Sequence, residues 1–168
     1  MAIDTTVAGT DSNSYVTLAE AKAALFGPAL TAWNNLSSNE EREAYVKRAA
    51  SIIEMQNLAG EKSDSTQALF FPRTTDYTLD DDDEEVYFIP PTIKKVQYAQ
   101  VSYLLLNEGF TEQSLEYRAK GIRDIGLGPG ATASFARSRP SAKDFLSAEA
   151  RALLAPYFSH PTIRIERA

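Results

Sequence analysis

The stretch SNEEREAYVKRAASIIE, residues 38–54, gives the clearest structural signal in the sequence. Ser38 can cap a helix start, and Glu41 stands at the reciprocal position three residues later. The early glutamates suit the positive end of a helix. Apolar residues then recur at helical spacing along one face: Tyr45, Ala49, Ile52 and Ile53. The stretch therefore predicts an amphipathic helix that ends around residues 57–60 and packs one face into a core.

Another helix is expected before this stretch. It begins at Thr17, which can form a capping box with Glu20. Gly27-Pro28 ends it, because proline cannot continue a helix. Trp33 then lies in a short apolar turn or helical piece, and we expect it to anchor the core rather than to stack on a nucleic-acid base.

Two more helices are expected after the central stretch. One follows Ile89-Pro90-Pro91, packs against the apolar face of residues 45–53 and stops at Gly109. The last runs from Ala148 to about Tyr157 and is capped by Ser147. These signals predict a mainly α fold, a small bundle of about four helices.

The remaining segments favour a small β element and two arms. Residues 121–127 alternate like a strand, Gly128-Pro129-Gly130 suits a turn, and residues 131–135 would form the second strand. The glycines also suggest a phosphate-binding loop, but the proline and the missing Lys-Ser or Lys-Thr make a hairpin the better interpretation. The expected organisation is listed by segment: an N-terminal arm, 1–14; a helical domain, 15–160, with an acidic loop, 76–88, and a β-hairpin, about 120–137; and an extended C-terminal strand, 161–168.

The composition argues against most catalytic sites. The 168 residues contain no cysteine, and the only histidine is His160. Thiolate chemistry, iron–sulfur clusters and cysteine zinc sites therefore have no ligands, and a single histidine near the chain end argues strongly against a catalytic triad or a multi-histidine metal site. We expect no catalytic residue, metal or cofactor. No apolar run approaches the roughly 20 residues of a membrane span, and the N-terminus lacks the pattern of a signal peptide, so we expect synthesis in the cytosol.

A run of carboxylates is concentrated in one loop: Asp80, Asp81, Asp82, Asp83, Glu84 and Glu85. Its alternation resembles the start of a calcium loop, but the turn glycine and the late glutamate are missing. An enzyme that uses a divalent metal would have Asp76, Asp80 and Asp82 as candidates, yet one loop gives them little rigid support. A solvated loop is the preferred interpretation.

Charge divides the chain into two unlike parts. The net charge is −6, but residues 110–168 carry nine basic and six acidic side chains, whereas residues 1–109 carry eight and 17. An acidic surface repels nucleic-acid phosphate. The two parts could instead attract one another between copies, or they could simply be solvated.

Several motifs, in order along the chain, resemble a family of tailed-bacteriophage proteins often labelled DnaT-like single-stranded-DNA-binding proteins, whose architecture is that of head-tail connector adaptors. The motifs are NSYVTLAEA at 13–21, WNNL at 33–36, RAASIIE at 48–54, QALFFPR at 67–73, IPP at 89–91 and LLAPY at 153–157. Phe71 stands where the family more often has tryptophan, the acidic run is not a family feature, and residues 109–147 match loosely.

The resemblance implies a non-enzymatic virion protein, made in the host cytoplasm and placed in the neck at the head-tail interface. It would form a ring, commonly of twelve copies, under the portal protein, extend the DNA channel and join the head to the next connector, stopper or tail protein. Packaged DNA would be only a sliding contact along the acidic run 80–85, and no membrane would be involved. Candidate contacts with the portal or a neighbouring subunit are Arg137, Arg139, Thr162, Ile163, Arg164, Ile165, Glu166 and Arg167. The strand at Ile163–Arg167 could instead pair within its own domain.

The alternative takes the family label literally and makes the chain a single-stranded-DNA-binding accessory protein of replication. Such a protein interleaves basic and aromatic residues along a groove. Most aromatics here stand at apolar helical positions, and few lie beside the best basic cluster: Arg118, Lys120, Arg123, Arg137 and Arg139.

Overall fold

The computed structural model describes residues 2–119, 124–128, 131–134 and 145–158, and the side chains within these ranges except for 108–119 and the two strands 124–128 and 131–134. The fold is mainly α, as expected, with five α-helices in the described part. The helices are α1 (Leu18–Ala24), α2 (Gly27–Asn35), α3 (Asn39–Glu54), α4 (Pro91–Ala119) and α5 (Ala148–Leu154), followed by a 3-10 turn (Ala155–Tyr157). The strands are β1 (Tyr77–Leu79), β2 (Glu85–Tyr87), β3 (Asp124–Gly128) and β4 (Ala131–Ser134).

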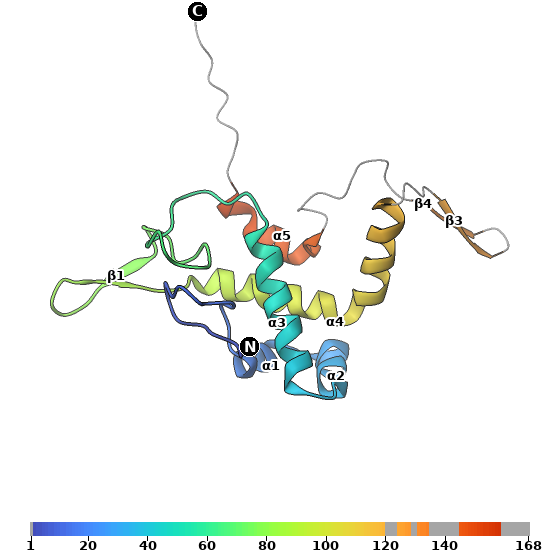
Figure 1. Ribbon diagram of the computed structural model, residues 1–168, viewed down its shortest axis with the longest axis horizontal. Helices are drawn as coiled ribbons and strands as arrows, with labels where there is room; N and C mark the ends of the chain where they lie inside the picture. The colour runs from blue at the N-terminus through green and yellow to red at the C-terminus, as the bar shows by residue number, and fades with distance from the viewer. Residues whose placement is uncertain (1, 120–123, 129–130, 135–144, 159–168) are drawn as a thin grey trace, which may run out of the picture.

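Helix α4 lies at the centre of the molecule (Figure 1). It contacts α3, α2 and α1, and α5 packs along its other side. The apolar faces meet in one core that includes Trp33, which is 2% exposed and is the core anchor expected from the sequence. Buried residues from the other helices complete this core: Ala21, Val46, Ala49, Ile53, Ile93, Val96, Val101, Ala150 and Leu154.

The expected helix starts are confirmed by their capping contacts. Thr17 and Glu20 form the complete capping box, and Ser38 accepts a hydrogen bond from the Glu41 amide. Ser147 caps α5 in the same way, through the Ala150 amide. The Glu41 carboxylate also accepts the amide and the hydroxyl of Ser37, the residue before the Ser38 cap.

One expected helix stop is confirmed and one is wrong. Helix α1 ends at Ala24, just before Gly27-Pro28. The same pair also opens α2, where proline suits the first turn because its missing N–H would have no partner. Gly109 lies inside α4, which continues to Ala119. Glycine in a helix interior costs only about 1 kcal/mol relative to alanine, and the helix formers that follow it offset that cost.

The acidic loop is framed by two short strands that we did not expect. β1 and β2 pair antiparallel with Thr78 opposite Val86, so the carboxylate run forms the end of a hairpin. The hairpin expected near residues 120–137 is confirmed by the antiparallel pairing of β3 and β4. Residues 2–14 form neither helix nor strand, and the C-terminal strand expected at 161–168 lies outside the described residues. None of the helices described is long and apolar enough to span a bilayer.

Candidate partner-binding surface

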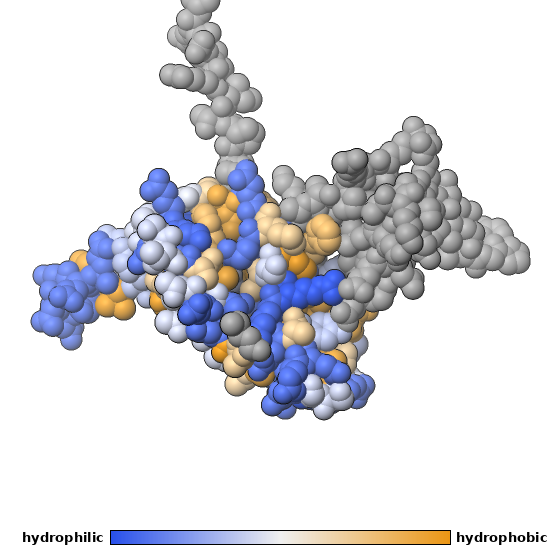
Figure 2. Space-filling view, in the orientation of Figure 1, coloured by the Kyte–Doolittle hydropathy of each residue, from blue (hydrophilic) through white to orange (hydrophobic). Residues whose placement is uncertain are grey.

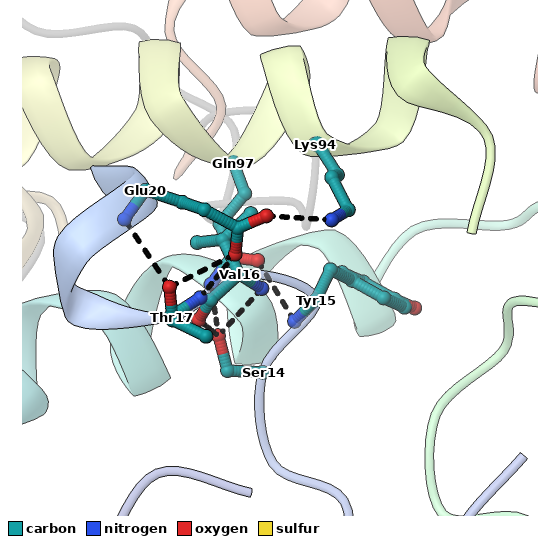
Figure 3. Close-up of polar contacts among 7 residues, drawn as sticks. All are labelled: Ser14, Tyr15, Val16, Thr17, Glu20, Lys94 and Gln97. Atoms are coloured by element: carbon teal, nitrogen blue, oxygen red, sulfur yellow. Dashed lines mark hydrogen bonds and ion pairs between the residues drawn. The ribbon is translucent and has the colours of Figure 1, made fainter. Parts of the chain in front are cut away.

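The motif at residues 14–20 fastens the N-terminal segment to α4 (Figure 3). The buried side chain of Gln97 accepts a hydrogen bond from the Tyr15 amide at 3.0 Å and donates to Ser14 Oγ at 2.9 Å. Nearby, Lys94 Nζ lies 2.7 Å from the Glu20 carboxylate. The Lys94 ammonium, together with the Thr17 hydrogen bonds, lowers the pKa of Glu20. The motif therefore acts as a structural attachment.

A second attachment joins three distant segments at Glu54, the last residue of α3. Its carboxylate accepts hydrogen bonds from the Tyr15 hydroxyl and, at 2.9 Å, from the Phe70 amide. Burial raises the pKa of Glu54, and it raises the pKa of Tyr15 as well. The Tyr15 hydroxyl and the Glu54 carboxylate hydrogen-bond to one another inside the protein. Because the same carboxylate accepts the Phe70 amide, it holds the 67–73 loop against the core.

That loop owes its shape to Gln67, which is 3% exposed. Its side-chain nitrogen donates to three backbone carbonyls, those of Leu69, Phe70 and Pro72, at 2.8–3.1 Å. Its oxygen accepts hydrogen bonds from Ser63 and Asp64. The Gln67 side-chain amide therefore provides hydrogen-bond partners for backbone groups of a loop that has no regular secondary structure.

Arg73 and Asp76 connect this loop to the β1–β2 hairpin. The Arg73 guanidinium donates to both carboxylate oxygens of Asp76, at 3.0 and 2.9 Å, and lies over the rings of Phe71 and Tyr157. The hydrogen bonds to Asp76 raise the pKa of Arg73. The backbone carbonyl of Asp76 accepts the Phe88 amide, so the two ends of the hairpin stem are held at one point.

The hairpin itself extends away from the core (Figure 1). Its large apolar side chains face solvent: Tyr77, Leu79, Val86 and Phe88 are 38–58% exposed. Cross-strand partners share a face of a hairpin, so the pairs Tyr77–Tyr87 and Leu79–Glu85 lie on the same side. Figure 2 shows orange patches beside the blue, hydrophilic tip. This combination of apolar stem and acidic tip is the candidate partner-binding surface.

Asp80 orders the turn at the tip. One carboxylate oxygen accepts the amides of Asp82 and Glu84, both at 2.9 Å. Asp83 has a φ of 62°, a backbone conformation that favours glycine. Within the residues that the structure describes, no three acidic or histidine side chains are grouped so that they could hold a metal ion. The side chains at 81–85 are exposed.

The candidate site residues from the sequence do not lie together in the structure. Asp76, a candidate in the metal-enzyme alternative, is buried in the ion pair with Arg73, whereas Asp80 and Asp82 stand at the tip. Arg137, Arg139 and Thr162–Arg167 lie outside the described residues. The apolar stem was missed. Its signal was the short run of β-forming residues on each side of the acidic run, Tyr77-Thr78-Leu79 and Val86-Tyr87.

Comparison with known proteins gives one match. The family model described as "Putative DnaT-like ssDNA binding protein" matches residues 1–168. No curated protein and no solved structure matches the chain.

Proposed function

The chain belongs to the DnaT-like ssDNA-binding protein family, and within that family we propose that it is a structural subunit that forms a head-to-tail ring and connects the head of a tailed bacteriophage to its tail. The ring would sit under the portal protein, and the next connector or tail component would bind its other side. No reaction is needed for this role.

The observation that carries the proposal is the β1–β2 hairpin. A two-stranded hairpin is marginally stable by itself in water, and this one also exposes Tyr77, Leu79 and Val86. Exposed apolar groups that project on a defined element favour a contact with another protein. Because the stem is fixed by Arg73 and Asp76, the hairpin is presented in a set direction.

The charges of the described core also favour a protein partner over nucleic acid. Most of its lysine and arginine side chains hydrogen-bond or pair within the chain: Arg42, Lys47, Lys62, Arg73 and Lys94. Phosphate binding requires cations that are free to displace counterions. Packaged DNA would therefore slide past the acidic tip, residues 80–85, without adhering to it.

Negative-stain images and mass photometry of the purified full-length protein test this proposal. We expect closed rings, with a subunit number near twelve, and the same protein in the necks of assembled particles. A chain that stays monomeric at all concentrations and is missing from particles would overturn the proposal.

The second candidate is single-stranded-DNA binding, and one specific observation favours it. The family description names this activity, so the match supports this candidate more directly than it supports the connector. The basic cluster that would contact phosphates, residues 118–139, has side chains outside the described part. In a titration with a fluorescent oligonucleotide, micromolar affinity that falls steeply with salt would favour this candidate. No binding, together with rings, would favour the connector.

A further inference from the structure

A groove on the helical core lies apart from the hairpin. Its walls are the end of α1 with Phe26, one side of α4 and the outer face of α5. Most of the lining is apolar: Ala24, Leu25, Phe26, Tyr98, Ala99 and Leu153. Phe26 is 83% exposed, which leaves one wall of the groove without cover. No residue of the hairpin lines this groove.

The size of the groove favours side chains as its occupant. Its volume is about 260 Å³. Sites that hold drug-sized molecules usually measure roughly 300–1,000 Å³. A small, open, apolar groove suits a few side chains from a protein surface.

The charges at the groove match the hairpin. Lys95, on its rim, is exposed and has no hydrogen bond or ion pair within the described part of the chain. On the hairpin, Glu85 lies directly opposite Leu79 in the β1–β2 register. The hairpin therefore offers an apolar side chain and a carboxylate side by side, and the groove offers an apolar wall and a free ammonium. Glu149 is the one acidic side chain that lines the groove.

We propose that the β1–β2 hairpin of one copy docks in this groove on a second copy, with Leu79 against Phe26 and Glu85 paired with Lys95. The inference rests on the proposed ring-forming function and names the two surfaces that meet. These surfaces are different parts of the subunit, so their contact is head to tail. Repetition of such a contact closes a ring when the rotation between subunits permits it.

Two complementary variants of the full-length protein test the pairing by mass photometry. Leu79→Asp disables the hairpin but keeps the groove, and Phe26→Asp disables the groove but keeps the hairpin. Aspartate is also a favourable residue at position 26, the N-cap of α2, so this variant should fold. Circular dichroism verifies that both variants are helical.

Each variant alone should associate at least about tenfold more weakly than wild type, because one buried apolar contact is replaced by a charge. An equimolar mixture should give dimers that grow no further, since only one intact hairpin and one intact groove remain. Lys95→Glu alone and Glu85→Lys alone should each weaken assembly. The two changes combined in one chain should restore it, because the ion pair re-forms with its charges exchanged. Met55→Asp is the control, because Met55 is 48% exposed and belongs to neither surface.

The outcomes separate this inference from the proposed function. If wild type forms rings and both variants form the same rings, the hairpin-groove pairing is wrong and the connector proposal stands. A mixture without dimers also overturns the pairing. If wild type never assembles, the ring itself is overturned.

Discussion

The side chain of Gln97 reaches across 83 residues of sequence to donate a hydrogen bond to Ser14 Oγ at 2.9 Å. The same amide accepts the Tyr15 backbone N–H and donates to the Val46 carbonyl. Gln97 is fully buried, so these contacts replace water for the groups involved. This glutamine is the point at which the N-terminal motif, α3 and α4 are held together.

Replacing Gln97 should therefore destabilise the fold. Gln97→Leu keeps a side chain of similar size but leaves the buried Tyr15 N–H without an acceptor. We expect the free energy of unfolding to fall by about 2–3 kcal/mol, since an unsatisfied buried group costs about 1–3 kcal/mol and the cavity must also adjust. Urea unfolding followed by circular dichroism measures this. Asn34→Leu, on the exposed side of α2, is the control and should change little.

Glu54 should give the stability a measurable pH dependence. Burial raises the pKa of Glu54 in the folded state above its unfolded value. The folded state then binds the proton more readily, so this contribution to stability is complete below the unfolded pKa and is lost as pH rises through the folded pKa. Relative to Glu54→Gln, wild type should become more stable as pH falls from 7 toward 4.5. A difference in unfolding free energy that does not vary with pH would contradict this.

Loss of the first helix cap should have a smaller effect. Thr17→Ala removes the hydroxyl that accepts the Glu20 amide and half of the capping box. The expected loss is about 1 kcal/mol, as for other N-cap substitutions. Thermal unfolding provides the measurement. Thr31→Ala, an exposed change within α2, serves as the comparison, and an equal loss in the two variants would argue against a capping role.

Arg73 should not be replaceable by lysine. The guanidinium donates to both oxygens of Asp76 and also lies over two aromatic rings, and a lysine ammonium cannot do all of this at once. We expect Arg73→Lys to destabilise the protein by about 2 kcal/mol, less than for a fully buried pair because Arg73 is partly exposed. Lys47→Arg keeps the positive charge of a partly buried i,i+4 pair with Glu43, so it should cost much less.

Assembly should depend on ionic strength. The acidic part of the sequence, residues 1–109, and the basic part, residues 110–168, would attract one another between copies. Because salt screens exposed charges, with a Debye length near 10 Å at 0.1 M and about 3 Å at 1 M, rings should weaken between these concentrations. Sedimentation velocity at both salt concentrations measures this. The same assembly state in both would show that charge does not organise the ring.

The local parts of the fold could be predicted from the sequence, and the long-range parts could not. Apolar periodicity and capping residues are encoded within a few positions, which is why α3, the capping box at Thr17 and the start of α4 were found. The end of α4 was missed because glycine's preference for helix ends is weak compared with a long helix anchored by its core contacts. The β1–β2 hairpin was missed because each strand has only three residues.

For the candidate surface too, the local features could be predicted from the sequence and the long-range contacts could not. The acidic run was visible at once, since charge is a property of composition. The role of Asp76 depends on Arg73, Phe71 and the stem of the hairpin, so no spacing rule indicates it. Buried glutamines such as Gln67 and Gln97 look like surface residues in a sequence, because their burial is possible only when several backbone groups converge on them.

The packing of α5 on α4 affects how a newly made chain can fold. Gln100 on α4 bonds to the Ser147 amide and the Phe145 carbonyl, and Leu154 completes the core beside them. During translation, the apolar side of α4 that α5 covers therefore stays exposed until almost the whole polypeptide has left the ribosome. Such an uncovered face is prone to aggregation. A nascent chain stalled before residue 145 should consequently be a substrate for chaperones, whereas the finished chain should not.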